Sequence, residues 1–248
     1  MRTPRPGRHE LGQNFLIDRN TIETVVRLVA GTSGPIIEFG TGDGALTLPL
    51  ERLGRPLTGV EIDDRRAARL AGVVRPPTRI VTADFLRFPL PETPCVLVGN
   101  LPFHLTTATL RHVLAAPAWT DAVLLVQWEV ARRRAGVGGA TMMTAQWWPW
   151  FDFRLAGRVP ATAFRPKPGV DGGLLTMIRR ERPLVDDADR ERYQDFVRRV
   201  FTGRGREIAP GVLPKNLTAL QWAEVFRLRR GSPPRARGAS SNRTGPRR

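Results

Sequence analysis

The chain has 248 residues, enough for one α/β domain with a small addition, and its formal net charge at pH 7 is +16. No apolar run approaches the ~20 residues of a membrane-spanning helix, and arginines without an apolar core precede Asn14, so we expect neither a membrane anchor nor a secretory signal. The single cysteine, Cys95, cannot form an internal disulfide, and together these features predict a cytoplasmic protein.

The first predicted strand is an apolar segment at 35–40, which runs directly into a glycine-rich loop at 40–44 and a helix at 45–53. Glycine lets the backbone approach a ligand closely. The spacing is not the G-x-G-x-x-G of dinucleotide sites, and Asp43 places an anion where a pyrophosphate would bind. The loop therefore suits a cationic cofactor without phosphate, such as S-adenosylmethionine, although Asp43 is equally suited to N-cap the next helix.

Two further predicted strands, 57–61 and 79–84, each end in an acid. Glu61 follows Gly42 by 19 residues and can accept hydrogen bonds from both hydroxyls of a ribose. Asp84 can accept from a purine amino group, and Phe85 beside it can pack on the purine ring. Either acid alone would usually be a solvated strand end, but their succession favours a binding site for an adenosyl group.

A fourth apolar strand, 95–99, leads into Asn100-Leu101-Pro102-Phe103. Loops at the carboxyl ends of strands are where open α/β sheets bind ligands. The Asn100 side-chain oxygen and the Leu101 carbonyl offer two acceptors for one NH2 group, and Phe103 can stack on a ring, a contact worth roughly 1–3 kcal/mol per base. Alone, such a tetrapeptide would be an ordinary turn; with the upstream features it predicts methyl transfer to the exocyclic amine of a nucleobase.

The remaining pattern predicts a helix at 106–115, a strand at 121–127, helices from 129 and around 141–147, and two strands at 151–159 and 174–180 that pair at the sheet edge. The strand-helix alternation indicates a mostly parallel sheet. Helices at 187–201 and 217–230 predict a small helical domain at 182–230, after a first domain at 1–181. From 231 to 248 the chain is rich in Gly, Pro, Ser and Arg without an acid, which predicts a disordered basic tail.

Only 2 of the 39 basic residues are lysine, and planar guanidinium groups suit phosphates and base faces. The charge favours a nucleic-acid partner, although arginine excess is also a consequence of a GC-rich genome, and a membrane surface is the competing anionic partner. We expect phosphate contacts from a helix end and a proline-rich loop, namely Arg132, Arg133, Arg134, Arg165 and Lys167.

Other conspicuous side chains have simpler interpretations. Cys95 lies in a predicted core strand, where a small apolar role is expected. His104 is a lone loop histidine, no cluster has metal-ligand spacing, and no metal is predicted. Among Trp147, Trp148 and Trp150, we expect at least two to pack in the core rather than to stack on bases.

The motifs together identify a known family. With these residues in hand, the chain resembles the ribosomal-RNA adenine N6-methyltransferases, and within them the Erm-type 23S rRNA enzymes associated with macrolide, lincosamide and streptogramin B resistance. The match covers roughly residues 9–180. It is carried by Gly12-Gln13-Asn14-Phe15-Leu16, Glu38-Phe39-Gly40-Thr41-Gly42-Asp43-Gly44, Asn100-Leu101-Pro102-Phe103, Gln127-Trp128-Glu129-Val130 and Ala163-Phe164-Arg165-Pro166-Lys167-Pro168-Gly169-Val170-Asp171.

The resemblance implies a Rossmann-like methyltransferase fold with a seven-stranded, mostly parallel sheet in residues 1–181, a small helical RNA-binding domain in 182–230, and S-adenosylmethionine as cofactor. It implies a monomer that acts on a single-stranded or extruded adenine of 23S rRNA, framed by Asn100 to Phe103. Many relatives carry tyrosine where this chain has Phe103, so no role of a hydroxyl carries over. The implied cofactor contacts are Asn14, Leu16, Gly40, Gly42, Glu61, Ile62, Asp84, Phe85 and Asn100.

Three alternatives remain open at this stage. A KsgA-like enzyme that dimethylates adjacent adenines of 16S rRNA shares most of these motifs, although Gln127-Trp128-Glu129 and the loop at 164–168 look more like the Erm branch. A DNA adenine methyltransferase would act on duplex DNA. A non-catalytic RNA-binding assembly factor would retain the cofactor pocket only for structure.

Overall fold

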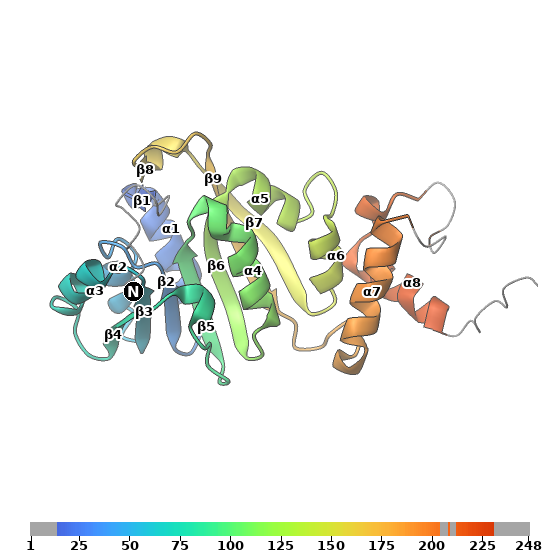
Figure 1. Ribbon diagram of the computed structural model, residues 1–248, viewed down its shortest axis with the longest axis horizontal. Helices are drawn as coiled ribbons and strands as arrows, with labels where there is room; N and C mark the ends of the chain where they lie inside the picture. Colours follow the sequence, from blue (N-terminus) through green and yellow to red (C-terminus); the bar gives the residue numbers. More distant parts are fainter. Residues whose placement is uncertain (1–13, 204–207, 209–211, 231–248) are drawn as a thin grey trace, which may run out of the picture.

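The computed structural model describes residues 14–203, 208 and 212–230, so the tail predicted at 231–248 lies outside the described residues. Its centre is a seven-stranded sheet (Figure 1). In spatial order the strands are β4 (Thr78–Thr82), β3 (Leu57–Glu61), β2 (Ile36–Phe39), β5 (Cys95–Asn100), β6 (Trp119–Gln127), β9 (Gly172–Arg179) and β7 (Phe151–Val159). The first five are parallel, whereas β9 is antiparallel to β6 and β7. The mostly parallel sheet with an antiparallel pair at its edge is therefore confirmed.

The order of the strands reverses at β2. From β2 the chain moves outward through β3 and β4, and it then returns to place β5 on the other side of β2. Ligands of open α/β sheets bind at the carboxyl ends of the strands that flank such a reversal. The residues at this position are Gly40, directly after β2, and Asn100, the last residue of β5.

Both faces of the sheet are buried at its centre, which is why β5 is continuously apolar, whereas the edge strand β7 alternates between buried and exposed residues. Along β5, Val96 and Val98 join a cluster with α1 (Arg19–Ala30) and α2 (Thr47–Glu51). Leu97, between them, joins the cluster on the opposite face with α4 (Thr106–Ala115). The period-2 alternation of the strand thus distributes its side chains between two helical layers.

Side chains define several helix ends. Asp18 caps α1 by accepting from the Thr21 backbone N–H at 2.8 Å, and Asp63 caps α3 (Asp64–Ala71) through the N–H groups of Arg65 and Arg66. Two shorter helices, α5 (Trp128–Arg134) and α6 (Met142–Trp147), follow β6. Short 3-10 turns span Phe85–Arg87, Phe103–Leu105, Ala161–Ala163, Asp187–Asp189 and Pro214–Asn216.

A separate pair of two-residue strands, β1 (Phe15–Leu16) and β8 (Phe164–Arg165), was not expected (Figure 1). Phe15 lies opposite Arg165 and Leu16 opposite Phe164 in antiparallel register. Two residues carry no periodicity, so the sequence gives no signal for this pairing. Its consequence is that the N-terminal segment packs against the loop that precedes β9.

The C-terminal helices α7 (Arg190–Phe201) and α8 (Ala219–Arg230) lie beyond α6, at the end of the molecule away from β3 and β4 (Figure 1). The Tyr193 hydroxyl donates to the Ala145 carbonyl at 2.9 Å, and its ring meets Trp150 edge-on at 5.5 Å. One apolar cluster runs from the sheet into these helices. The helical segment is as expected, while its standing as a separate RNA-binding domain stays a prediction.

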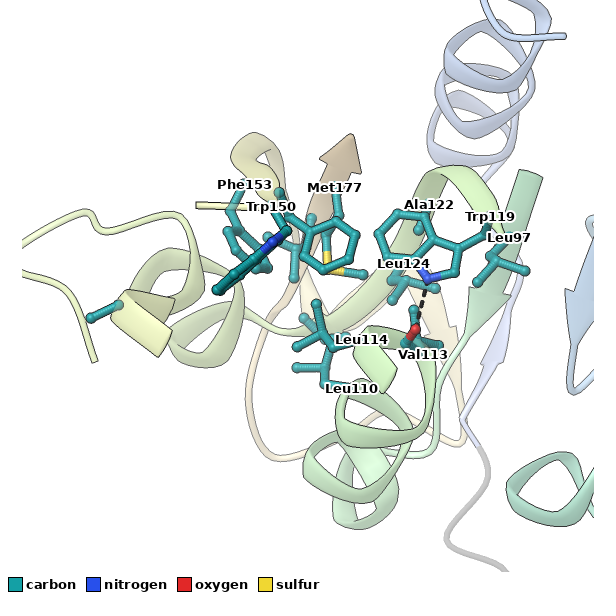
Figure 2. Packing of buried hydrophobic residues seen from close by; sticks show 14 of the residues in the cluster. Leu97, Leu110, Val113, Leu114, Trp119, Ala122, Leu124, Trp150, Phe153 and Met177 are labelled. Atoms are coloured by element: carbon teal, nitrogen blue, oxygen red, sulfur yellow. Dashed lines mark hydrogen bonds between the residues drawn. The ribbon is translucent and has the colours of Figure 1, made fainter. Parts of the chain in front are cut away.

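Aromatic side chains fill the core beneath α4 and α6 (Figure 2). Trp119 stacks on Phe151 with ring centroids 4.7 Å apart and donates its indole N–H to the Val113 carbonyl at 2.6 Å. Trp150 is fully buried, and Trp147 and Trp148 pack against the same cluster, so the expected core role of these tryptophans is confirmed.

Cys95 is buried as expected, and burial raises the pKa of its thiol to about 11. Within residues 14–203, 208 and 212–230, no helix has the length and apolar character needed to cross a bilayer.

Candidate active site

The loop after β2 lies beside the end of β5. Phe39 and Gly99 are paired in the parallel register, and a Cβ atom on Gly40 would lie 3.9 Å from the Asn100 carbonyl oxygen. The structure therefore brings together two residues that are 60 positions apart and that were both assigned to the site. Their meeting point is the crevice where the strand order reverses.

The glycine loop depends on a backbone conformation that other residues rarely adopt. Gly40 and Gly42 have φ values of +67° and +55°, in the left-handed region. A Cβ atom on Gly42 would lie 3.2 Å from the Phe15 ring, so a side chain there would be both strained and crowded. The loop's backbone is thus left uncovered by side chains of its own at these two positions.

Glu61 fixes this loop from the neighbouring strand. One carboxylate oxygen accepts from the Gly42 backbone N–H at 2.7 Å, and the other accepts from the Asp63 N–H at 3.0 Å. Each oxygen keeps a second lone pair for a ligand. Ile62, the next residue, is 51% exposed although it is apolar, which leaves an uncovered hydrophobic surface beside the carboxylate.

Asp84 and Phe85 follow β4 at the same edge of the sheet. The Asp84 carboxylate accepts from the Leu86 N–H at 3.0 Å and caps the 3-10 turn that follows. One face of Phe85 stacks on Phe39 at 3.5 Å between ring centroids, and its edge meets His112. Phe85 is thereby held in place while remaining only partly buried.

The Asn100 side chain is oriented by the N-terminal segment. Its Nδ2 donates to the Asn14 carbonyl at 2.7 Å. Its Oδ1 accepts no hydrogen bond from the described residues, so the acceptor end of the amide is available to a ligand. Asn14 and Asn100 therefore meet at one end of the sheet, and Leu16 is buried two residues after Asn14; the cofactor contacts implied for all three stay predictions.

The backbone after Asn100 offers the second acceptor. The Leu101 N–H is used, because it donates to the Leu125 carbonyl at 3.0 Å, and the Pro102 carbonyl is used by the Leu105 N–H at 2.9 Å. The Leu101 carbonyl between them receives no donor from the part of the chain that the structure describes. Phe103 is partly exposed and meets the buried Phe164 edge-on at 6.1 Å.

Sequence reasoning assigned no role to two residues near the site. Phe164, in β8, lies 61 residues further along the chain and supports Phe103, a contact that no local sequence pattern predicts. Glu38 lies in β2 and is 1% exposed, and its Oε2 has no hydrogen-bond partner among the described residues. Burial raises the Glu38 pKa to about 8, and the Glu61 charge adds to the shift. The sequence feature that could have pointed to Glu38 is an acid inside an otherwise apolar strand.

Asp43 does not cap the helix that follows it, so that prediction was wrong, while its contact with a cofactor stays a prediction. The helix α2 that follows has no side-chain cap. The Asp43 carboxylate instead forms ion pairs with Arg66 and Arg69 of α3, both at 2.5 Å. Arg66 also lies over the Phe15 ring at 4.3 Å from its centroid. These contacts tie the glycine loop to α3 and to the N-terminal segment.

The three arginines of α5 do not share one exposed face. Arg132 and Arg133 point outward and pair with Glu129. Arg134 points inward and donates to the Thr141 hydroxyl at 2.5 Å; burial lowers its pKa, and the nearby charge of Arg111 lowers it further. The exposed helix end expected here is therefore formed by Arg132 and Arg133, not by Arg134. Arg165 and Lys167 are exposed on the loop after β8.

His104 is exposed at the edge of this site and makes no hydrogen bond to the described residues. Those residues contain no group of three or more histidine, cysteine, aspartate or glutamate side chains placed to hold a metal ion.

Comparisons with known proteins agree on one group. The family described as "Ribosomal RNA adenine dimethylase" matches residues 5–224. An "rRNA adenine N-6-methyltransferase" of Corynebacterium diphtheriae is 58% identical over 82% of this chain and 80% of its own length. "Mycinamicin-resistance protein MyrB" of Micromonospora griseorubida is 43% identical over 94% of this chain and 83% of its own. The crystal structure of the 23S rRNA methyltransferase ErmE is 31% identical, with a TM-score of 0.80 over 86% of this chain and 98% of that one.

Proposed function

Because the chain belongs to the ribosomal RNA adenine dimethylase family, we propose that it methylates the N6 amine of an adenine in the peptidyl transferase region of 23S rRNA and so confers resistance to macrolide, lincosamide and streptogramin B antibiotics. The observation that carries the proposal is the pair of acceptors at Asn100 and Leu101 (the methylation notch) that receive no donor from the described residues and lie beside the glycine loop. The names of the relatives, a resistance protein and a 23S rRNA methyltransferase, support it.

The residues around the crevice fit S-adenosylmethionine. When bound, this cofactor supplies a methyl group activated by a sulfonium. The exposed backbone at Gly40 suits its aminoacyl part, and the acids Glu38 and Glu61 suit a ligand that carries cationic and hydroxyl groups but no phosphate. Ile62 and Phe85 offer apolar surfaces to an adenine ring, and Asp84 an acceptor for its amino group. Asn14 and Leu16 close the corner next to Asn100.

In this proposal Asn100 and Leu101 act on the target amine. Its lone pair is delocalised into the adenine ring, so the nitrogen is a poor nucleophile. Hydrogen bonds from its two N–H groups to Asn100 Oδ1 and to the Leu101 carbonyl would draw it toward a tetrahedral geometry. The Asn14 carbonyl supports this role by holding the amide in one orientation, and Pro102 supports it through its fixed φ. The proton can leave to water after transfer, so no strong base is required.

We assign to Phe103 the role of stacking on the face of the target base. Its ring is partly exposed and is held by the edge contact to Phe164, so a base can stack on it without a large loss of side-chain freedom. An adenine within a duplex cannot reach such a notch, so the substrate is an unpaired or extruded nucleotide. Arg132, Arg133, Arg165 and Lys167 are assigned contacts to its flanking phosphates. An rRNA substrate favours the cytoplasm as the site of action, and we propose a monomer.

The test is methyl transfer from labelled cofactor to naked 23S rRNA and 16S rRNA in parallel, followed by mapping of reverse-transcriptase stops. We expect label in one adenine of 23S rRNA, and none after the change Asn100→Ala. Label in adjacent adenines of 16S rRNA would replace the proposal with a small-subunit dimethyltransferase, and label in duplex DNA with a DNA enzyme. RNA binding without transfer would indicate an assembly factor.

The resistance part is tested separately in a susceptible bacterium. Expression of the chain should raise the macrolide concentration needed to stop growth, whereas the Asn100→Ala variant, expressed at the same level, should not. Resistance that persists with this variant would mean that methylation is not its cause.

A further inference from the structure

An open pocket with a volume of about 560 Å³ lies beside the proposed methylation notch. It is formed where β6 passes into α5 and where the loop after β8 returns to β9. Its chemistry comes from Gln127, Trp128, Glu129, Arg158, Lys167 and Asp171. The volume falls in the range typical of ligand sites. The pocket is lined by two of the family motifs, and the proposed chemistry gives Gln127-Trp128-Glu129, the first of them, no role.

The pocket is adjacent to the target base rather than part of its notch. Asn100 lies opposite Leu125 in the parallel register of β5 and β6, and Gln127 follows two residues later on β6. From strand spacing and rise, Asn100 and Gln127 are separated by roughly 8 Å along the sheet edge. This is a separation that a single step along an unpaired nucleic-acid strand can span.

Arg158 is held in a fixed orientation at the pocket wall. Its Nε and Nη2 both reach one carboxylate oxygen of Asp171, at 2.8 and 2.7 Å, and its guanidinium lies 5.3 Å from the centroid of the Trp128 ring. The other Asp171 oxygen accepts from the Ala161 N–H, and hydrogen bonding and the Arg158 charge lower the Asp171 pKa. The result is an exposed planar cation that lies over an aromatic ring, and nucleobases stack on guanidinium planes of this kind.

Gly173 makes room for this arrangement. It lies opposite Arg158 on β9, and a Cβ atom there would be 2.7 Å from the Ala131 side chain and 3.2 Å from the Trp128 ring. Any side chain at Gly173 would displace Trp128 from the wall. The glycine therefore lets the indole lie against the sheet.

The charges favour an anion. Both carboxylates at the pocket already have cationic partners. Glu129 pairs with Arg132 and Arg133, and Asp171 pairs with Arg158. Lys167 is exposed and makes no ion pair with the described residues. The Lys167 charge also helps to lower the Asp171 pKa, but that carboxylate is already paired with Arg158, so two cations share one acid here. An ammonium beside a stacking surface is the combination that binds one nucleotide through its phosphate and its base.

We propose that this pocket binds the nucleotide next to the target adenine, with its base against Trp128 and Arg158 and its phosphate at Lys167. The inference rests on the proposed function, since it takes an RNA strand at Asn100 as its starting point. It makes Trp128 and Arg158 substrate-positioning residues for the sequence that flanks the methylated base.

The experiment measures binding of a 23S rRNA fragment that contains the target adenine, compared with two fragments that have an abasic residue on its 5′ or 3′ side. The variants are Trp128→Leu, Trp128→Phe and Arg158→Gln. Arg154→Gln is the matched control, because Arg154 lies on the same strand, is equally exposed and pairs with Asp152 through the same two nitrogens. Thermal unfolding checks that each variant folds. If Trp128→Leu does not fold, Arg158→Gln provides the test on its own.

Trp128→Leu and Arg158→Gln should weaken binding of the intact fragment about tenfold, whereas Trp128→Phe and Arg154→Gln should leave it unchanged. One of the two abasic fragments should bind the unaltered protein as weakly as the intact fragment binds Trp128→Leu and Arg158→Gln. These two variants should bind that abasic fragment no more weakly than they bind the intact one. Equal losses by Arg158→Gln on all three fragments, or equal binding of all three by the unaltered protein, would overturn the inference.

Methyl transfer is measured in parallel and separates the two proposals. A fragment that binds with this pattern but is not methylated would refute the proposed function and leave the nucleotide pocket standing. Methylation that does not depend on the neighbouring base would support the proposed function and refute the nucleotide pocket. A protein that binds none of the fragments would refute both.

Discussion

Replacing Glu38 with glutamine should remove a large part of the pH dependence of folding stability. The side chain is 1% exposed, its Oε2 has no hydrogen-bond partner among the described residues, and Glu61 lies near enough to repel its charge. Burial, with that repulsion added, raises the Glu38 pKa from 4.5 to about 8. The fold therefore favours the protonated acid, whereas the unfolded chain ionises near the ordinary value.

The direction and size of the change in folding stability with pH follow from this difference in pKa between the folded and unfolded states. Below pH 4.5 the acid is protonated in both states and costs nothing; as the pH rises toward 8, only the unfolded state ionises, and stability is lost. One pKa unit corresponds to about 1.4 kcal/mol, so the loss amounts to about 3 kcal/mol at pH 7 and about 5 kcal/mol above pH 8. Glutamine has nearly the same shape but does not ionise, so Glu38→Gln should escape this loss.

The assay is urea denaturation of both proteins, without cofactor, at intervals from pH 5 to pH 9. The stability of the variant relative to the unaltered protein should rise up to about pH 8 and then level off, because both states are ionised above the folded-state pKa. Any fixed cost of burying an amide cancels, because only the change with pH is compared. Glu23→Gln on the exposed side of α1 serves as the control and should give a flat difference. A flat difference for Glu38→Gln as well would refute the assignment of a buried, protonated acid.

Three further outcomes are expected. Asn100→Ala should slow methyl transfer by roughly a hundredfold while changing cofactor affinity far less, measured by single-turnover kinetics and calorimetry; equal losses would assign Asn100 to binding alone. Phe103→Ala should weaken turnover on RNA by the roughly 1–3 kcal/mol of a stacked base, and Phe103→Tyr should retain it; an inactive tyrosine variant would exclude stacking. Deleting residues 231–248, which carry five arginines and no acid, should reduce the log-log slope of RNA affinity against salt by up to about 3.5, and an unchanged slope would make the tail irrelevant to binding.

The parts of the fold that follow local rules could be predicted. The strands at 57–61 and 151–159 and the helix at 106–115 have the bounds that their patterns indicate, because each is a periodic segment bounded by turn-forming residues. The site could be located for a related reason. Ligand-binding residues of a parallel sheet lie at strand ends, so Gly40, Glu61, Asp84 and Asn100 could be placed at one edge from sequence order alone.

The contacts that orient these residues could not be predicted, because they join distant segments. The bond from Asn100 to Asn14 spans 86 positions, and the edge contact of Phe103 with Phe164 spans 61. Charges were misjudged for the same reason. Asp43 was considered as a helix cap, but its carboxylate forms ion pairs with two arginines of α3 and caps no helix. Arg134 was taken as exposed, but it is partly buried and donates to the Thr141 hydroxyl.

Buried acids in this fold lie where the proposed cofactor would bind. Glu38, inside β2, and Glu61, at the end of the adjacent β3, are each 1% exposed. No arginine or lysine forms an ion pair with either among the described residues, although arginine is abundant in the chain. A core selected for stability alone would not retain such a pair, since replacing a buried unpaired acid with an apolar residue usually stabilises a protein. Sequences break local rules mainly where function requires it. The pair is therefore best explained by a cationic ligand that reaches this edge of the sheet, and the cost predicted for Glu38 in the free protein is the measurable sign of that arrangement.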